Sequence, residues 1–232
     1  MAVDDLSFTV TDGEILGLLG PNGSGKTTAF NLIAGALRAD AGRVSLAGQD
    51  VTYAPAHVRT RLGIARTFQL IRPLPHLSVL DNVLVARLYS RGGVSSIAAA
   101  RSDGLQYLGL VELGAKAQRL AANLTLAERK RLEIARALAT NPRILLLDEP
   151  LGGLSAAEVD AALALFRRIR AGGVTLVIVE HNVLAMRAIC ERVLVLSYGR
   201  RIAEGRPDDV LTQREVVQTY LGTGTSVTWK FS

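Results

Sequence analysis

Short apolar runs alternate with amphipathic helical patterns along most of the chain, and this alternation predicts an α/β fold. Apolar runs of strand length occupy residues 15–19, 144–147, 174–179 and 193–196. Helical periodicity occupies residues 26–37, 127–139, 156–170 and 182–190. Because strands that alternate with helices usually pair in parallel, we expect a mostly parallel sheet that is covered by helices on both faces.

The N-terminal part of the chain carries two weaker strand patterns. Residues 6–10 alternate apolar and polar side chains, as a half-buried strand does, and this register turns Phe8 toward the core. Residues 43–46 predict a second strand, which is followed by a turn at 48–50. We expect an N-terminal antiparallel β subdomain here.

From about residue 70 to 123 the pattern is helical without intervening strands. Pro73 and Pro75 act as helix breakers, and residues 91–93 form a glycine-containing link. We therefore expect a helical lobe that is inserted into the α/β core. Residues 223–232 form a tail without a clear pattern.

Composition narrows the class of protein. The 232 residues are 49% hydrophobic and 21% charged, which is typical of a folded globular chain. No apolar run approaches the roughly 18 residues that span a bilayer, and residues 1–5 lack the pattern of a secretory signal. The single cysteine, Cys190, excludes an intramolecular disulfide and a cysteine-built zinc site. We expect a cytoplasmic protein in a reducing compartment.

The chain has a basic surplus, with 27 Lys and Arg residues against 21 Asp and Glu residues. Nucleic-acid binding is one explanation, but the basic residues are scattered and aromatic residues make up only 5%. A surface that stacks bases needs aromatic side chains among its cations. We therefore expect no nucleic-acid partner, and anionic lipid or a phosphate-rich ligand also suits the surplus.

A glycine-rich motif follows the apolar run 15–19 and opens the predicted helix at 26. It reads Gly20-Pro21-Asn22-Gly23-Ser24-Gly25-Lys26-Thr27-Thr28. The sequence matches the P-loop, in which glycines let backbone N–H groups approach phosphate oxygens at a helix N-terminus. Lys26 then supplies a charge to the β- and γ-phosphates, and the Thr27 hydroxyl is suited to coordinate Mg²⁺. A glycine-rich turn with a solvated lysine is the structural alternative.

Two carboxylates and a histidine follow other predicted strands. Asp148 and Glu149 end the run 144–147, and His181 comes shortly after the run 174–179. The carboxyl ends of parallel strands are where ligands bind in open α/β sheets. Asp148 is suited to the Mg²⁺ shell, Glu149 to polarising an attacking water, and His181 to a hydrogen bond with the γ-phosphate. An incidental histidine is the alternative at 181, and His57 and His76 are given no role.

These motifs together resemble the nucleotide-binding subunit of an ABC transporter over residues 1–222. The stretches 63–69, 75–85 and 131–139 are most similar to importers of branched-chain amino acids and urea-like amides, and 179–182 with 191–196 extends the match. The resemblance implies one ABC ATPase domain with a P-loop NTPase core. The RecA-like core would comprise 1–69 and 136–222, and the helical lobe about 70–135.

The resemblance also implies roles for individual residues. Gln69 would contact Mg²⁺ and the attacking water at the start of the lobe that meets the membrane subunit. Glu149 would be the catalytic base, and His181 would sense the γ-phosphate. Residues Thr125, Leu126, Ala127 and Glu128 occupy the signature position, which closes over ATP bound to the opposite subunit. A head-to-tail dimer with two composite sites follows.

The signature segment departs from the usual Leu-Ser-Gly-Gly-Gln. Leu126 and Ala127 replace the two glycines, so their side chains are expected to crowd the partner's γ-phosphate. The segment also has the pattern of a capping box, which is the structural alternative for Thr125 and Glu128. A further departure is Ser155, where an aspartate is common.

The family has an additional strand before Ala2 that carries an aromatic residue stacked on adenine. This sequence shows no such residue. We expect either that the true start lies upstream or that adenine is held weakly.

The resemblance implies an ATPase that uses ATP and Mg²⁺ at the inner face of the cell membrane. Its partners would be transmembrane permease subunits, a second ATPase subunit of the same or a related sequence, and a solute-binding protein. Import of branched-chain amino acids or related amides is the leading hypothesis. The alternatives are a lipopolysaccharide-type exporter ATPase and a weakly catalytic nucleotide-binding regulatory module. A soluble cassette acting on nucleic acid and a small-molecule kinase fit the chain less well.

Overall fold

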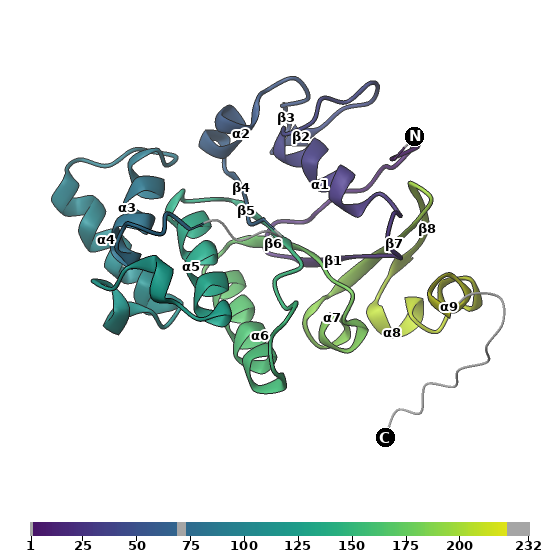
Figure 1. Cartoon of the computed structure of the whole chain (residues 1–232). Helices are drawn as coiled ribbons and strands as arrows, with labels where there is room; N and C mark the ends of the chain where they lie inside the picture. The colour runs from purple at the N-terminus through teal and green to yellow at the C-terminus, as the bar shows by residue number, and fades with distance from the viewer. Residues whose placement is uncertain (1, 69–72, 222–232) are drawn as a thin grey trace.

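A six-stranded sheet forms the centre of the computed structural model, which describes residues 2–68 and 73–221 (Figure 1). Its order is β4-β5-β6-β1-β7-β8, and every neighbouring pair is parallel except β7–β8. The strands are β1 (Ile15–Leu19), β4 (Ile64–Arg66), β5 (Ile144–Asp148), β6 (Thr175–Val179), β7 (Arg192–Ser197) and β8 (Arg200–Gly205). The expectation of a mostly parallel α/β sheet is confirmed.

Helices cover both faces of this sheet (Figure 1). One face carries α1 (Lys26–Ala34), α2 (Ala56–Leu62) and the antiparallel pair β2 (Ser45–Leu46) and β3 (Gln49–Asp50). The other carries α6 (Ala156–Ala171), α7 (Val183–Ile189), α8 (Pro207–Val210) and α9 (Arg214–Leu221). Alternate residues of β1 enter the two cores, because Leu16 and Leu18 pack toward α1 while Ile15 and Leu19 pack on the opposite side.

A group of helices packs together at the β4 side of the sheet (Figure 1). It contains α3 (Val79–Leu88), α4 (Ile97–Leu110), the short 3₁₀ helices η1 (Gly114–Lys116) and η2 (Ala121–Asn123), and α5 (Leu126–Ala139). Leu80, Val83 and Leu108 are fully buried between these helices. This arrangement agrees with the helical stretch expected after residue 70. The division between core and lobe at 135 and 136 stays a prediction, and α5 runs across it.

The strand predicted at 6–10 is wrong as a paired strand. Leu6, Phe8 and Val10 alternate with exposed neighbours and pack against the core beside α1, so the predicted faces are right. Among the described residues, 6–10 pair with no strand. Next to this segment Asp4 N–H donates to Gly199 O at 2.9 Å, and within it Thr9 O accepts from the Arg192 guanidinium at 2.7 Å. The described antiparallel β pair in this region is β2 with β3.

Two boundaries near α1 also differ from the predictions. The helix predicted to residue 37 ends at Ala34, because Gly35 adopts a left-handed φ of 75° and closes it. The predicted strand 43–46 is reduced to Ser45–Leu46, and Gln49–Asp50, predicted as a turn, forms β3. The turn lies one step earlier, where Ala47 and Gly48 both have positive φ.

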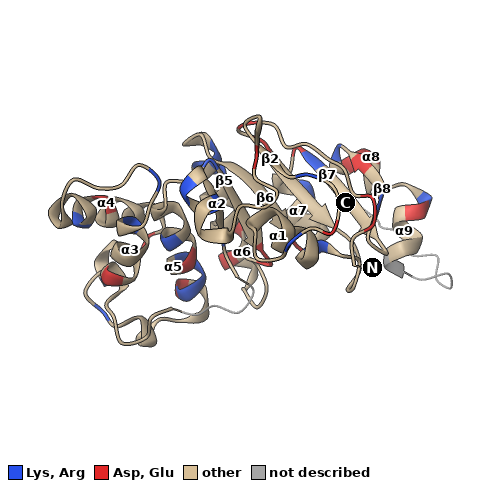
Figure 2. Ribbon diagram, turned by 90° about the horizontal axis from the view of Figure 1, so that it is seen from above, with Lys and Arg blue, Asp and Glu red and all other residues tan. Residues whose placement is uncertain are grey.

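Charged residues are spread over the elements, with Lys and Arg at both ends of the molecule (Figure 2). Within residues 2–68 and 73–221, no helix combines the length and the apolar character that a bilayer span requires. The same part of the chain holds no group of three or more His, Cys, Asp or Glu residues arranged for a metal ion.

Candidate active site

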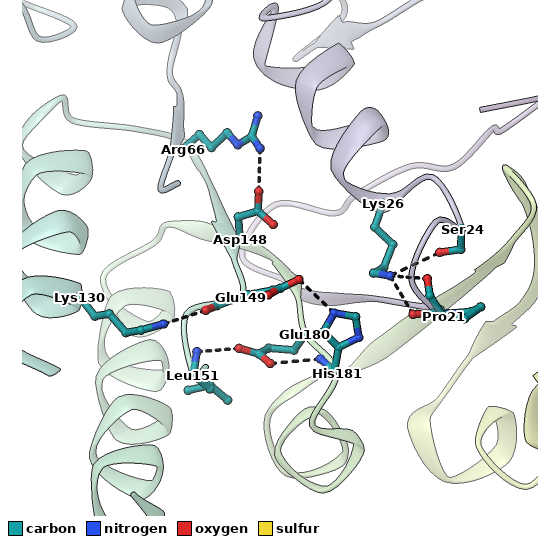
Figure 3. A network of polar contacts seen from close by, with 11 residues as sticks. Pro21, Ser24, Lys26, Arg66, Lys130, Asp148, Glu149, Leu151, Glu180 and His181 are labelled. Atoms are coloured by element: carbon teal, nitrogen blue, oxygen red, sulfur yellow. Dashed lines mark hydrogen bonds and ion pairs between the residues drawn. The ribbon is translucent and has the colours of Figure 1, made fainter. Parts of the chain in front are cut away.

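The carboxyl ends of β1, β5 and β6 bring the predicted site residues to one edge of the sheet (Figure 3). These strands are neighbours in the order β5-β6-β1. The P-loop follows β1, Asp148 ends β5 with Glu149 directly after it, and His181 lies two residues beyond the end of β6. Register pairs Asp148 with Val179, so the carboxylates and the histidine are side by side.

The P-loop leaves the first turn of α1 suited to an anion. Its N-cap residue is Gly25, which provides no side-chain hydrogen bond, and the first turn contains no acidic residue. Gly20, Gly23 and Gly25 have φ values of 145°, 79° and 104°. A Cβ on Gly25 would lie 2.4 Å from Ala2 O, so close packing requires a glycine there. The exposed residues Asn22 and Thr27 flank these amides. The loop can therefore surround phosphate oxygens with N–H donors.

Lys26 folds back over its own loop. Its ammonium donates to Gly20 O and Pro21 O, both at 2.8 Å, and more weakly to Ser24 Oγ at 3.4 Å (Figure 3). The side chain is only 5% exposed. Burial lowers the pKa of Lys26, and the charges of Glu149 and Asp148 oppose that shift. These two carboxylates therefore act electrostatically on the lysine that faces the phosphate position.

Asp148 is held by an arginine that the sequence did not indicate. Arg66 Nη2 donates to Asp148 Oδ2 at 2.6 Å, and both side chains are nearly buried (Figure 3). Asp148 N–H donates to the Thr67 hydroxyl at 3.2 Å. The one feature of the sequence that could have indicated this role is the charged Arg66 at the end of the short strand β4.

Glu149 and His181 contact each other. Nε2 of His181 lies 3.0 Å from Oε1 of Glu149, and both side chains are partly exposed (Figure 3). Glu149 has a φ of 47°, a left-handed conformation that is strained for a residue with a Cβ. Strained residues of this kind concentrate at functional sites, where the surrounding structure enforces them. The carboxylate is therefore held in one direction.

Two charged residues, the partly buried Lys130 and the buried Glu180, hold the backbone next to Glu149 and His181, and sequence analysis missed both. Lys130 of α5 donates to Glu149 O at 2.9 Å. Glu180 accepts from Leu151 N–H at 2.6 Å and from His181 N–H at 3.1 Å (Figure 3). Burial lowers the pKa of Lys130 and raises the pKa of Glu180, and each partly offsets the shift of the other.

The signature segment caps α5. Thr125 Oγ1 accepts from Glu128 N–H at 3.3 Å, and Glu128 accepts from Thr125 N–H at 3.1 Å, which is a capping box. A hydrogen bond from Lys116 is the main cause that lowers the pKa of Glu128. Leu126 is about half exposed, whereas Ala127 is buried. Of the two residues that replace glycines, Leu126 is therefore the one that faces outward.

The residues expected to bind Mg²⁺ suit that ion in part. Thr27 offers a hydroxyl and Asp148 a carboxylate, and Mg²⁺ prefers oxygen ligands of this kind together with substrate phosphates and water. Gln69, the other predicted ligand, lies outside the described residues.

Comparisons with known proteins support this interpretation. A profile of the ABC transporter family matches residues 3–152. The chain is 40% identical over 222 residues to the lipopolysaccharide export system ATP-binding protein LptB of Escherichia coli (strain K12), covering 95% of this chain and 90% of that protein. It is 33% identical over 235 residues to the high-affinity branched-chain amino acid transport ATP-binding protein BraF of Pseudomonas aeruginosa, covering 96% and 92%.

Solved structures agree with the sequence comparisons. An ATP-binding cassette of an ABC transporter in its ADP conformation superposes with a TM-score of 0.86 at 32% identity, covering 95% of this chain and 92% of that one. A dimeric cassette in a post-hydrolysis state, bound to ADP and Pi, superposes with a TM-score of 0.79 at 28% identity, covering 89% and 90%. The chain therefore belongs to the ABC transporter family, as one of its ATP-hydrolysing cassettes.

Proposed function

We propose that this chain is the ATP-hydrolysing subunit of a membrane transporter and binds at the cytoplasmic face of transmembrane permease subunits. The observation that carries the proposal is the convergence of Lys26, Asp148, Glu149 and His181 at the carboxyl edge of β1, β5 and β6. A phosphate-binding helix terminus, a carboxylate for a metal shell and a paired glutamate and histidine are the parts that phosphoryl transfer to water requires.

The proposed roles follow from these positions. Residues Gly20, Asn22, Gly23, Ser24, Gly25, Lys26, Thr27 and Thr28 bind the triphosphate through backbone amides and the Lys26 ammonium. Thr27 and Asp148 hold Mg²⁺, together with Gln69. When bound, the ion neutralises charge that develops on the phosphate oxygens. Glu149 takes a proton from the attacking water, and His181 donates a hydrogen bond to the γ-phosphate.

We further infer a head-to-tail dimer in which residues 125–128 complete the partner's site. The first turn of α5 begins at Leu126 and is capped by Thr125, and a helix N-terminus is a favourable position for an anion. The dimeric relative bound to ADP and Pi supports this assembly. Half-exposed Leu126 stands where it would meet the partner's nucleotide, and this altered signature is the reason to keep a weakly catalytic regulatory role as an alternative.

For the transported solute, we propose import of branched-chain amino acids or related amides, with a solute-binding protein as a further partner. The support is the segment 63–69, which resembles such importers, together with the similarity to BraF. The 40% identity to LptB favours a second candidate, an ATPase of lipopolysaccharide export, for which no solute-binding protein is proposed. In both cases the solute is bound by other subunits.

Calorimetry tests the nucleotide proposal directly. Titrating the purified chain with ATP and Mg²⁺ should show saturable heat, and Lys26→Ala should remove most of it because the phosphate charge loses its buried partner. Phosphate release over many turnovers should be seen with wild type. Wild-type protein that is folded but neither binds ATP nor releases phosphate would contradict the proposal.

Complementation separates the two transport candidates. Expression of this chain in a strain that lacks its branched-chain amino acid transport ATPase should restore leucine uptake, with Glu149→Gln as the inactive control. Expression in a strain depleted of LptB should leave growth unrestored. Rescue of growth in the second strain without uptake in the first would favour the export function.

A further inference from the structure

We propose that Arg66 is a positioning residue that holds the Asp148 carboxylate in the orientation in which it binds Mg²⁺. The inference rests on the proposed function, since it concerns the same metal position. Arg66 lies at the end of β4, directly across the β4–β5 pair from the strand that carries Asp148 (Figure 3). It enters the site from an edge strand and does not face the phosphate loop itself.

The guanidinium of Arg66 donates hydrogen bonds to two partners. Nη2 donates to Oδ2 of Asp148 at 2.6 Å, and Nη1 donates to the side-chain oxygen of Asn31 on α1. Asn31 thus orients the guanidinium, which in turn orients the carboxylate. This series of contacts, from Asn31 through Arg66 to Asp148, therefore connects helix α1, which begins at the phosphate loop, with strand β5, which ends at the proposed metal position.

Two aromatic rings restrict the guanidinium further. Its Cζ lies 5.8 Å from the centroid of the Phe30 ring and 5.3 Å from that of Phe68, both within cation–π range. Nε is buried, and no hydrogen-bond partner for it is found among residues 2–68 and 73–221. The position of the group is therefore determined by its two Nη contacts and the rings, and its freedom to move away from Asp148 is small.

The arrangement matters because Asp148 contributes the one carboxylate proposed for this metal. Among the described residues, Arg66 is the side chain that donates a hydrogen bond to the Asp148 carboxylate, and the oxygen that accepts it is Oδ2. The other oxygen is left for the metal shell. Partners that orient a metal-binding carboxylate typically contribute a factor of about 10 to 100 in metal affinity.

A purely structural ion pair between β4 and β5 is the competing explanation. It would stabilise the fold without affecting the metal selectively. A third possibility is that Arg66 competes with Mg²⁺ for the carboxylate, in which case its removal would strengthen metal binding. The three explanations differ in how Mg²⁺ changes nucleotide affinity, so that quantity is the readout.

The experiment measures binding of the non-hydrolysable analogue AMP-PNP with Mg²⁺ and, separately, with EDTA. The ratio of the two affinities reports how much the metal contributes. For Arg66→Met we expect this ratio to fall about tenfold or more, while the affinity in EDTA stays within about twofold of wild type. Arg66→Lys keeps the charge but lacks the planar two-nitrogen fork that contacts Asp148 and Asn31, so its ratio should lie between those of wild type and Arg66→Met.

Arg192→Met is the matched control. Arg192 pairs with the buried carboxylate of Glu14 at 2.7 Å, at the opposite end of the sheet from the site. The variant loses this partly buried ion pair, together with the contacts of Arg192 to Glu204 and to Thr9 O, and should leave the ratio unchanged. An equal fall in Arg192→Met, an unchanged ratio in Arg66→Met, or a ratio that rises would each overturn the proposal.

Asn31→Ala keeps the proposal testable if Arg66→Met does not fold. It removes one Nη contact and leaves the pair with Asp148 in place, so the ratio should fall by a smaller factor of about two to five. A normal ratio in both Asn31→Ala and Arg66→Lys would refute the positioning role. Failure of the proposed function is distinct, because it would appear as absent AMP-PNP binding by wild type in EDTA and in Mg²⁺.

Discussion

Nε2 of His181 lies 3.0 Å from Oε1 of Glu149, which joins the segments that follow β6 and β5. The imidazole is 41% exposed and the carboxylate 25% exposed at this contact. Contact with the imidazole restricts the orientation of the carboxylate, while part of the carboxylate surface stays open to water. The pair is therefore arranged so that a water molecule can reach Glu149 and a phosphate group can reach His181.

Glu149→Gln should lower ATP turnover by roughly two orders of magnitude or more, because a carboxamide cannot accept the proton of the attacking water. ATP binding should be retained, since the phosphate loop is untouched, and the unhydrolysed nucleotide should hold two chains together. Phosphate release and size-exclusion chromatography with ATP measure both effects. Turnover equal to that of wild type would remove Glu149 as the base.

His181→Ala should also lower turnover, by about tenfold or more, because the histidine both orients Glu149 and is proposed to bind the γ-phosphate. Its effect should not add to that of Glu149→Gln, since the two residues act as one unit. His57→Ala is the control, because His57 is exposed on α2 away from the sheet edge. A double variant that loses the product of the two single effects would contradict this coupling.

Lys130→Met should reduce kcat by roughly ten- to a hundredfold with little change in nucleotide affinity. The reason is that the Glu149 carbonyl loses its hydrogen-bond donor, so the strained backbone at Glu149 is no longer held in place. The measurement is a steady-state comparison of kcat and KM. Arg91→Met is a matched control: Arg91 donates to the carbonyl of Asn141, which also has positive φ, at the far end of β5. A similar kcat loss in the control would refute a specific role.

The regular part of this fold could be predicted because its strands are buried on both faces. β1, β5, β6 and β7 read as continuous apolar runs, and no charge interrupts their centres. The edge strands were missed for the opposite reason. β4 is three residues long and contains Arg66, whereas β8 begins with two arginines. The one local indication before β8 was Gly199, which forms with Tyr198 a turn in which both residues take positive φ.

The candidate site divides in the same way. Its phosphate loop and the residues at the ends of β5 and β6 were predictable, because a local motif and the rule for strand ends place them together. The residues that hold them were not. Lys130, Glu180 and Arg66 act on partners 19, 29 and 82 positions away, and no local pattern encodes such contacts.

Thr125→Ala should lower the free energy of unfolding by about 1 kcal/mol, because α5 loses the oxygen that caps its N-terminus. Ser96→Ala removes the matching cap of α4, where Ser96 Oγ accepts from Ala99 N–H at 3.1 Å, and should cost a similar amount. Urea denaturation measures both. If residues 125–128 also serve the partner's site, only Thr125→Ala should lower turnover in protein that is still folded. Equal turnover in the two variants would argue for capping alone.

Cys190 should be chemically inert in the folded chain. Burial, followed by the negative charges of Glu191 and Glu14, raises the pKa of its thiol to about 12. Since the thiolate is the reactive form, labelling by a disulfide reagent at pH 8 should be at least a hundredfold slower than in guanidinium. Fast labelling of the native chain would show that the open surface pocket beside Cys190 admits the reagent and that the thiol ionises there.

The same thiol makes stability depend on pH in a defined direction. An unfolded cysteine titrates near 8.5, so above that pH the unfolded chain loses a proton that the folded chain keeps. The contribution of the protonated thiol is complete below about pH 8.5 and is lost as pH rises toward 12. Wild type should therefore lose unfolding free energy relative to Cys190→Ala by up to about 1.4 kcal/mol per pH unit in this range. Urea titrations of both proteins at pH 8, 9 and 10 measure the difference, and parallel curves would mean that Cys190 ionises equally in the two states.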